Sequence, residues 1–208
     1  RGQLPLPVSP PVTSIVLAAG AGSRLGNRPK ALLMFGGTTA LQRVVAASLA
    51  GGCDGVVVVL GAHMGAVRGG LPRDPRVRAV VNEQWESGQS SSLQTGWREV
   101  EESHDVLLFP VDYPLVDAEV VRQLIVARAG SDAERIVPVY TGQRGHPVVL
   151  RADVRERVLA VKSGESVRSV FGSTAEVVVA NEAVLWDVDT WAEVERLQGL
   201  ADLGPSTP

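Results

Sequence analysis

"LAAGAGSRLGNRPKALL" (residues 17–33) runs from the apolar end of an expected strand into a loop that contains three glycines, two arginines and a lysine. The strand is TSIVLA (residues 13–18), a short apolar run of the kind that is buried in a sheet. Gly20, Gly22 and Gly26 let the backbone turn tightly and point several N–H groups inward, which forms an anion-binding concavity. Open α/β sheets bind their ligands at the carboxyl ends of strands, so this loop is a candidate phosphate site.

Positive charge in the same loop supports this interpretation. Arg24 and Lys30 can neutralise phosphate oxygens, and together with the inward N–H groups they suit a triphosphate. The alternative is a glycine-rich turn between a strand and a helix, with both cations facing solvent. The three glycines alone leave the two interpretations equally open.

Two common nucleotide-binding motifs do not match the loop. The dinucleotide fingerprint G-x-G-x-x-G fails because three residues separate Gly22 from Gly26, and no acidic residue near Gly61 ends the second strand. The P-loop pattern fails because Lys30 is followed by Ala31 rather than by a magnesium-binding serine or threonine. A Rossmann dehydrogenase and a P-loop NTPase are therefore both disfavoured.

The order of elements along the chain predicts an α/β fold. Apolar runs alternate with segments of helical period, which is typical of a mostly parallel sheet with helices on its faces. Strands are expected at residues 13–18, 55–61, 76–82 and 105–111. The helix between the first two strands is expected to end at the glycine pair 51–52 and to bury Leu41, Val44, Val45, Ser48 and Leu49.

The second half of the chain predicts an antiparallel part of the sheet. Residues 134–140 and 146–151 indicate two strands joined by the turn TGQRG (residues 141–145). Two further strands are expected at residues 175–180 and 185–189. Together with the parallel part, these strands predict a mixed sheet.

Capping signals mark two further helices. Asp117 is a plausible N-cap for a helix that buries Val120, Val121, Leu124 and Ile125. Thr190 and Glu193 form a capping box for a last helix. That helix is expected to bury Trp191, Val194 and Leu197.

Length and charge limit the classes of function. The 208 residues suffice for one domain, which we expect at residues 13–199 between disordered tails at residues 1–12 and 200–208. A net charge of -3 argues against nucleic acid as a partner. No apolar run reaches the ~20 residues of a membrane-spanning helix, and the first dozen residues lack the layout of a secretory signal. The single Cys53 cannot form an internal disulfide, so a cytoplasmic protein is expected.

Acidic residues follow two expected strands. Asp112 comes just after the strand at residues 105–111, where a carboxylate near a phosphate loop is well placed to hold Mg²⁺. Asp187 and Asp189 are two residues apart, so they would share one face of a strand. The alternatives are that Asp112 caps a turn and that Asp189 caps the last helix.

Two other segments carry polar side chains suited to binding. Residues 82–96, NEQWESGQSSSLQTG, are rich in groups that could hydrogen-bond a nucleobase and a ribose, with Asn82, Gly88 and Ser92 as candidates. The alternative is a solvated loop that leads into a capped helix. His146, in RGHPVVL, could contact a second substrate, although a lone histidine in a tight turn is more often structural.

Nothing in the sequence resembles a Ser-His-Asp or Cys-His constellation. Nucleotidyl transfer needs neither, because the attacking phosphate is already an anion. That reaction needs alignment and positive charge, which Arg24, Lys30 and Mg²⁺ can supply. An in-line displacement at a phosphorus atom is therefore the most economical chemistry for these residues.

These segments resemble the molybdenum cofactor nucleotidyltransferases, most closely the molybdenum cofactor cytidylyltransferases. The likeness extends from about Ser14 to Leu197. It is carried by the glycine loop, the loop at residues 82–96, PVDYPLV, RGHPVVL and WDVDTWAEVERL, in the order and approximate spacing of the family. Each motif is weak alone, and the set is specific.

The resemblance implies a Rossmann-like three-layer α/β/α sandwich that binds CTP and transfers CMP to the terminal phosphate of molybdopterin or its molybdenum form, releasing pyrophosphate. It implies that Arg24 and Lys30 bind the phosphates, with Asp112 as a third catalytic residue. Asp112 and Asp189 would hold Mg²⁺, and His146 would face the pterin. A molybdoenzyme or its chaperone would receive the product. The implied nucleotide-binding residues are Ala18, Ala19, Gly20, Gly22, Ser23, Arg24, Lys30, Asn82, Gly88 and Ser92.

Some features leave the substrates open. Many relatives carry glutamine after the metal-binding aspartate, where this chain has Tyr113. LAAG (residues 17–20) favours the cytidylyl over the guanylyl branch, which tends to carry glycine at the position of Ala19, but sugar-phosphate enzymes share this form. The alternatives are a guanylyltransferase of the same cofactor, a sugar-phosphate nucleotidylyltransferase, and a noncatalytic nucleotide-binding protein that delivers the cofactor.

Overall fold

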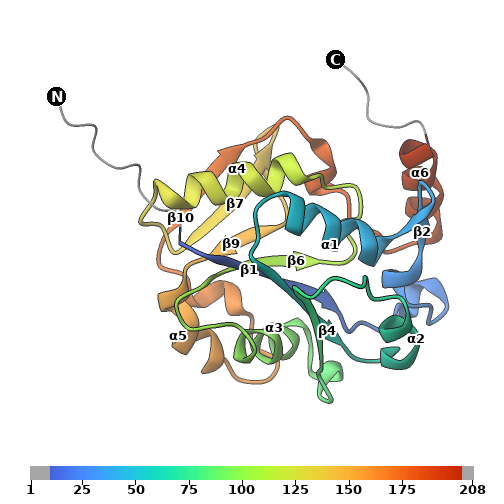
Figure 1. Cartoon of the computed structure of the whole chain (residues 1–208), viewed down its shortest axis with the longest axis horizontal. Helices are drawn as coiled ribbons and strands as arrows, with labels where there is room; N and C mark the ends of the chain where they lie inside the picture. The colour runs from blue at the N-terminus through green and yellow to red at the C-terminus, as the bar shows by residue number, and fades with distance from the viewer. Residues whose placement is uncertain (1–9, 203–208) are drawn as a thin grey trace.

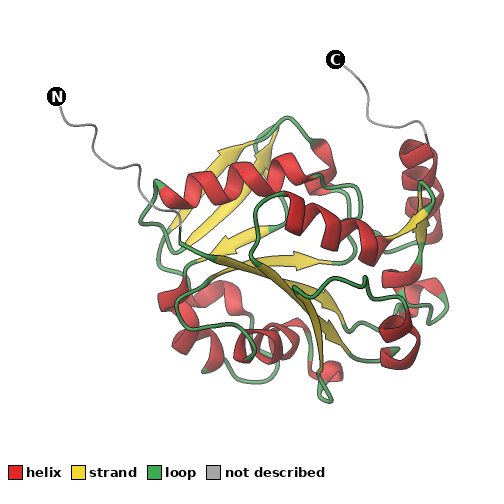
Figure 2. Cartoon of the chain, viewed as in Figure 1, coloured by secondary structure: helices red, strands yellow, loops and turns green. Residues whose placement is uncertain are grey.

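The computed structural model describes residues 10–202 and places one mixed sheet between two layers of helices (Figures 1 and 2). The strand order is β10-β7-β9-β6-β1-β4-β5, and the short β8 pairs with β7. β1 is parallel to β4 and β6, β4 is parallel to β5, and β7 is parallel to β10. Only β9 and β8 run antiparallel to their neighbours in this sheet. The predicted α/β class, with a mostly parallel mixed sheet, is confirmed.

The elements have the following bounds. The strands are β1 (Val12–Ala18), β2 (Met34–Phe35), β3 (Thr38–Thr39), β4 (Gly55–Leu60), β5 (Val77–Val81), β6 (Asp105–Pro110), β7 (Arg135–Tyr140), β8 (Gln143–Arg144), β9 (Val148–Leu150) and β10 (Thr174–Val178). The helices are α1 (Ala40–Ala50), α2 (Met64–Gly69), α3 (Gln89–Arg98), α4 (Ala118–Ala129), α5 (Arg155–Leu159) and α6 (Trp191–Asp202). Short 3-10 helices are η1 (Ser23–Leu25), η2 (Lys30–Leu32), η3 (Trp85–Ser87), η4 (Ala152–Val154), η5 (Val167–Val170) and η6 (Glu182–Leu185).

The sheet separates two hydrophobic cores. Successive residues of a strand point to opposite faces, so β1 sends Val16 to one core and Ile15 to the other. The first core packs under α1, α4 and α6, and the second packs under α3 and α5, where Trp97 is fully buried. Central strands buried on both faces explain why the sequence contains continuous apolar runs rather than an alternating pattern.

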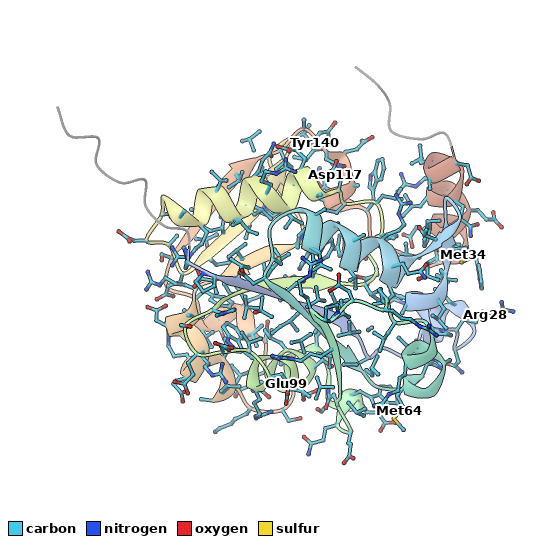
Figure 3. All side chains as sticks on the ribbon, viewed as in Figure 1. Arg28, Met34, Met64, Glu99, Asp117 and Tyr140 are labelled. Carbon is cyan, nitrogen blue, oxygen red and sulfur yellow. The ribbon has the colours of Figure 1, made fainter. Side chains whose placement is uncertain are left out.

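The predicted helix starts follow the expected capping chemistry. Asp117, labelled near the start of α4 in Figure 3, accepts a hydrogen bond from the backbone N–H of Val120. The backbone N–H of Thr190 donates to Glu193 at 2.7 Å, and the backbone N–H of Glu193 donates to the Thr190 hydroxyl at 3.4 Å. Both caps satisfy N–H groups that have no partner within the helix.

The C-terminal part of the described chain differs from expectation in three ways. Residues 185–189 are not a strand: η6 ends at Leu185 and the following residues join no sheet. The last helix continues past Gly199 to Asp202. Trp191 is 42% exposed rather than buried, and the Arg28 guanidinium lies over its ring, 5.5 Å from the ring centroid. Residues 1–9 and 203–208, where most of the two expected tails fall, lie outside the described residues.

Among residues 10–202, no helix is long and apolar enough to cross a membrane.

Candidate active site

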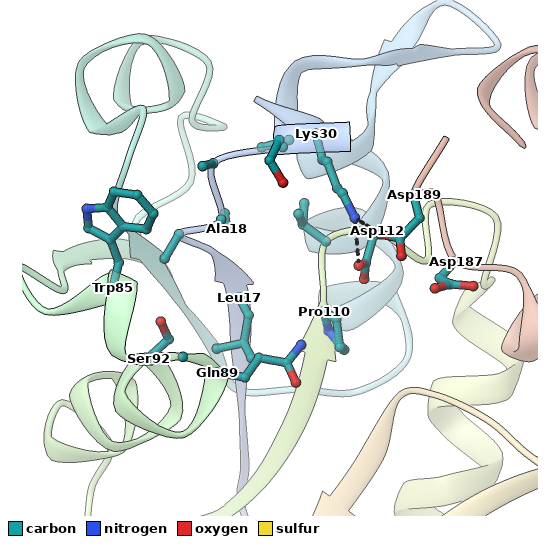
Figure 4. A pocket seen from close by; sticks show the side chains of 18 of the residues that line it. Leu17, Ala18, Lys30, Trp85, Gln89, Ser92, Pro110, Asp112, Asp187 and Asp189 are labelled. Carbon is teal, nitrogen blue, oxygen red and sulfur yellow. Dashed lines mark hydrogen bonds and ion pairs between the residues drawn. The ribbon is translucent and has the colours of Figure 1, made fainter. Parts of the chain in front are cut away.

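A cavity of about 600 Å³ lies at the carboxyl ends of β1 and β6 (Figure 4). This is the edge where parallel α/β sheets bind ligands, because several strands end there and their loops can converge. Of the residues predicted for the site, Gly26 and Asn82 do not line this cavity. Those that do are Ala18, Ala19, Gly20, Gly22, Ser23, Arg24, Lys30, Gly88, Ser92, Asp112, His146 and Asp189.

The glycine loop has the backbone that its sequence predicts. Gly22 and Gly26 have φ values of 65° and 68°, in the left-handed region that favours glycine. A Cβ at Gly22 would also overlap the carbonyl oxygen of Arg28, so that position excludes a side chain for a second reason. The ring of His63 donates a hydrogen bond to the carbonyl of Ala21 at 2.9 Å, which ties the loop to the N-terminus of α2.

The cations and carboxylates predicted for the site form one network. Lys30 Nζ lies 3.3 Å from Asp112 Oδ2 and also contacts Asp189 Oδ1 (Figure 4). Arg24 Nη1 lies 2.7 Å from the other oxygen of Asp189. Two positive and two negative groups, drawn from three separate segments of the chain, therefore balance one another at the cavity wall.

The ionisation of these groups follows from their burial and their partners. Burial by itself would lower the pKa of Lys30, but the charges of Asp112 and Asp189 outweigh it and raise that pKa. The hydrogen bond from Lys30 lowers the pKa of Asp189. Burial raises the pKa of Asp112, against the pull of Lys30, and the nearby negative charge of Asp187 adds to the rise. Lys30 is therefore cationic. Of the two carboxylates that it contacts, Asp112 is the one whose ionised form is disfavoured, so a further positive charge would stabilise it.

Backbone hydrogen bonds bring Asp189 beside Asp112. The N–H of Val188 donates to the carbonyl of Asp112 at 2.9 Å. The N–H groups of Asp189 and Thr190 both donate to the Glu193 carboxylate, at 2.8 and 2.7 Å. The segment expected to be a strand is therefore an extended stretch fixed at one end to the β6 loop and at the other to α6.

The carboxylates fit a hard divalent cation. Asp112 Oδ1 is buried and has no hydrogen-bond partner, which leaves one oxygen free for a ligand. Asp187 and Asp189 line the same cavity. Within residues 10–202 no group of three or more acidic, histidine or cysteine side chains is arranged to hold a metal ion unaided. One or two carboxylates completed by phosphate oxygens and water is the pattern that Mg²⁺ favours.

Asn82 has a supporting position rather than a place in the cavity wall. Its side chain is buried, and its amide donates to the hydroxyls of Ser91 and Ser92 at 2.9 and 3.0 Å. Its carbonyl oxygen accepts a hydrogen bond from the backbone N–H of Gln84. Gly88, with φ of 105°, precedes α3 and lines the cavity. The loop that the sequence marked does line the cavity through Gly88 and Ser92, but Asn82 points into the loop and organises it.

His146 lines the cavity beside Tyr113 and is neutral. Its ring centroid is 5.0 Å from that of Tyr113, and its backbone N–H donates to the carbonyl of Val184. Burial lowers the pKa of His146 to about 4, and the positive charges of Arg168 and Arg135 add to this effect. A neutral imidazole can donate or accept a hydrogen bond but cannot serve as a cationic phosphate ligand at neutral pH.

Several other cavity residues were not predicted individually, among them Trp85, Gln89 and Arg168. Trp85 and Gln89 belong to the polar loop that the sequence marked, so they follow from its composition. Arg168 comes from η5, in a segment without any recognisable motif. Only the folded chain brings Arg168 to this edge of the sheet.

Comparison with known proteins places these features in a family. The family described as "MobA-like NTP transferase domain" matches residues 14–178. A nicotine blue oxidoreductase of Paenarthrobacter nicotinovorans is 36% identical, over 90% of this chain and 97% of that protein. A molybdenum cofactor guanylyltransferase of Nitrobacter hamburgensis is 26% identical, over 92% of this chain and 96% of that protein.

Solved structures give a consistent result. The Rv0371c protein of Mycobacterium tuberculosis is 28% identical with a TM-score of 0.77, over 91% of this chain and 98% of that one. A structure of Rv0371c in complex with manganese is similar to this chain with a TM-score of 0.74 and 27% identity, over 91% of this chain and 98% of that one.

Proposed function

We propose a function for this chain from the premise that it belongs to the MobA-like NTP transferase family and is a nucleotidyltransferase. The proposed reaction transfers CMP from CTP to the terminal phosphate of molybdopterin or its molybdenum form and releases pyrophosphate. The observation that carries the proposal is the meeting of Lys30, Arg24, Asp112 and Asp189 beside the glycine loop.

The glycine loop is the proposed triphosphate site. Gly22 has a left-handed backbone, and it lines the cavity together with Gly20 and Ser23, where N–H groups can donate to phosphate oxygens. Lys30 is held by two carboxylates, so its ammonium group has a defined position before the substrate arrives. A charge fixed in this way needs little reorganisation when negative charge develops on the departing pyrophosphate.

Asp112 and Asp189 are the proposed ligands of Mg²⁺. The unpartnered Asp112 Oδ1 and the acidic donor set support this assignment. A divalent cation is also consistent with the manganese in the complex of the Mycobacterium tuberculosis protein. When bound, such an ion supplies positive charge to the phosphate oxygens of the nucleotide.

The proposed chemical step is a displacement at the α-phosphorus. An oxygen of the acceptor phosphate attacks and forms the new phosphorus–oxygen bond, while the bond to the oxygen that bridges the α- and β-phosphates breaks. Pyrophosphate leaves with that electron pair. No general base is required, because the attacking oxygen already carries negative charge, and the task of the residues is alignment and charge stabilisation.

Cytosine is the proposed base of the nucleotide. The identity of the acceptor is less constrained by the sequence and the structure than the identity of the base. Ala19 supports the cytidylyl branch. Because the chain is similar to a guanylyltransferase, GTP is an alternative donor. The chain is also 35% identical, over 62% of its length, to a 2-C-methyl-D-erythritol 4-phosphate cytidylyltransferase of Deinococcus radiodurans. A polyol phosphate is therefore an alternative acceptor.

A second candidate is an oxidoreductase, favoured by the 36% identity to the Paenarthrobacter nicotinovorans protein over nearly all of its length. The glycine loop does not have the dinucleotide fingerprint, and the fixed Lys30 with its two carboxylates suits phosphate transfer better than hydride transfer. Oxidation of NADH and NADPH with a dye acceptor measures this alternative directly.

The deciding experiment is a pyrophosphate-release screen. CTP, GTP, UTP and ATP are each paired with molybdopterin and with several sugar and polyol phosphates, in Mg²⁺ and in Mn²⁺. We expect release with CTP and molybdopterin, and release that is slower by about 100- to 1000-fold with Lys30→Ala. Release from no combination, or undiminished release by Lys30→Ala, would overturn the proposal.

A further inference from the structure

Two carbonyl groups of the glycine loop accept hydrogen bonds from the turn between β4 and α2. The backbone N–H of Ala62 donates to the carbonyl of Ala19 at 3.1 Å, and the ring Nε2 of His63 donates to the carbonyl of Ala21 at 2.9 Å. Neither Ala62 nor His63 lines the cavity of the candidate active site. The turn therefore contacts the glycine loop from a side that does not face the cavity.

Gly61 lets this turn approach the glycine loop closely. A Cβ at Gly61 would lie 2.5 Å from the carbonyl oxygen of Ala19 and 2.8 Å from the Cβ of Trp85. Any side chain at this position would push the turn away from the glycine loop. The hydrogen bonds from Ala62 and His63 would then lengthen.

The two hydrogen bonds fix the direction of two N–H groups of the loop. In a trans peptide unit the carbonyl and the following N–H point in opposite directions, and the units 19–20 and 21–22 are both trans. Because both carbonyls point to the turn, the N–H groups of Gly20 and Gly22 point the other way, toward the cavity that both glycines line. Among residues 10–202, neither of these N–H groups has a hydrogen-bond acceptor.

Of the two contacts, the one from His63 is supplied by a side chain. Within the described residues 10–202, the Ala21 carbonyl has no other hydrogen-bond donor. A carbonyl oxygen only accepts, so Nε2 of His63 carries the proton, which selects one tautomer of the neutral ring. Gly22 is left-handed, with φ of 65°, as in backbone turns whose N–H groups converge on an anion. Without the His63 donor, the peptide unit between Ala21 and Gly22 could rotate and turn its N–H away from the cavity.

We propose that His63 is a positioning residue of the phosphate site. Its Nε2–H holds the Ala21 carbonyl away from the cavity, so the Gly22 N–H is aimed at a phosphate oxygen before the nucleotide binds. The ring itself does not touch the ligand, which is a polyphosphate chain. A donor that already has its direction loses little conformational freedom on binding, so the affinity for the phosphates is higher. This assignment rests on the proposed triphosphate site.

Two substitutions separate the hydrogen bond of His63 from the packing of its side chain. His63→Phe keeps a planar ring and removes the donor, whereas His63→Gln keeps an N–H donor at the end of the side chain. We expect His63→Phe to weaken the binding of CTP and of tripolyphosphate equally, each by about tenfold. We expect His63→Gln to bind both ligands within about threefold of the wild type. Calorimetry in the presence of Mn²⁺ measures the four affinities.

His104→Phe is the matched control. Nδ1 of His104 lies 2.8 Å from the hydroxyl of Thr13, near the start of β1, whereas the glycine loop follows the other end of that strand. The substitution also removes one histidine hydrogen bond, but His104 does not line the cavity. We therefore expect His104→Phe to bind CTP and tripolyphosphate with wild-type affinity. Circular dichroism establishes that each variant is folded.

A measurement on the wild-type protein tests the hydrogen bond without any substitution. Nitrogen NMR distinguishes a protonated ring nitrogen from an unprotonated one, and we expect the proton of the neutral His63 ring on Nε2. This result does not depend on a bound ligand. It tests the inference even where His63→Phe fails to fold.

Three results would overturn the inference: wild-type affinity of His63→Phe for tripolyphosphate, no recovery of affinity in His63→Gln, or a His63 ring proton on Nδ1 alone. The pyrophosphate-release screen tests the proposed function separately, because it measures transfer rather than binding. Tripolyphosphate binding that depends on His63, in a protein that releases no pyrophosphate with any acceptor, would support the inference and contradict the proposed function. Equal release by the wild type and by His63→Phe, with equal affinity for CTP, would do the reverse.

Discussion

The ammonium group of Lys30 lies 3.3 Å from the carboxylate of Asp112, although 82 positions separate the two residues in the sequence. One was expected to bind phosphate and the other a metal ion, and in the folded chain each neutralises the other. The pair joins the glycine loop after β1 to the loop after β6, which are neighbouring parallel strands. The pairing of these two strands therefore brings the two loops, and the two charges, together at one edge of the sheet.

Replacing Lys30 tests the phosphate role. Lys30→Ala removes the one ammonium group that both carboxylates contact, so we expect the rate of pyrophosphate release to fall by about 100- to 1000-fold. The chain has one other lysine, Lys162, which is exposed and outside the cavity of the candidate active site. Lys162→Ala is the matched control and should release pyrophosphate at the wild-type rate. A folded Lys30→Ala protein with normal turnover would show that the ammonium group is dispensable.

Replacing the carboxylates tests the metal role. Asp112→Asn and Asp189→Asn keep the side-chain shape but remove a negative ligand, so we expect each to weaken Mn²⁺-dependent binding of CTP by about tenfold or more. Calorimetry with and without Mn²⁺ measures the effect. Asp74→Asn is the control, because Asp74 pairs with Arg76 and does not line the cavity. Metal dependence that survives in both site variants would exclude these aspartates as ligands.

Alanine substitution at two glycines of the loop distinguishes the cost of backbone strain from the cost of steric overlap. Gly22 and Gly26 both have left-handed φ values, but only at Gly22 would a Cβ meet neighbouring atoms within 4 Å. We expect Gly26→Ala to lower the free energy of unfolding by about 1 kcal/mol, and Gly22→Ala by about 2 kcal/mol or more. Urea denaturation of the two variants measures the difference. Equal losses would mean that the Arg28 carbonyl moves aside at no cost.

The neutral state of His146 predicts a pH dependence of stability. Its pKa is about 4 in the folded protein, against 6.5 ordinarily, so the unfolded chain binds more protons between these values. As the pH falls from 7 to 4, protonation favours unfolding. We therefore expect the wild-type protein to lose about 2 kcal/mol more of its unfolding free energy than His146→Gln, allowing for the partial exposure of the ring.

Denaturation curves at several pH values check this expectation. Asp112 titrates in both proteins and cancels in the comparison, so the difference in slope reports His146 alone. Parallel loss of stability in the two proteins would show that His146 has an ordinary pKa.

Local patterns in the sequence determined most of the fold. The apolar runs of β1, β4 and β6 are short, those of β1 and β4 are rich in β-branched residues, and glycine or proline lies at or near the end of each. Asp117 and Thr190 mark helix starts through side-chain chemistry that acts over three or four residues. The glycine loop was recognisable for the same reason, since left-handed residues in a tight turn favour glycine.

The tertiary structure determined which segments and side chains of the site are neighbours. The segment at residues 185–189 has the composition of a strand, yet it joins no sheet because its backbone is held by Asp112 and Glu193. Asn82 has the chemistry of a base-binding side chain, but its contacts turn it into the loop.

The ion pairs of the site and the position of Arg168 at the cavity could not be predicted from local patterns either. Lys30 and Asp112 meet because β1 and β6 are neighbours in the sheet, and Arg168 reaches the cavity from a segment without a motif. Local chemistry acts over a few residues and can be read along the chain, whereas these contacts join segments far apart in sequence. They exist only once the strands have paired and the helices have packed.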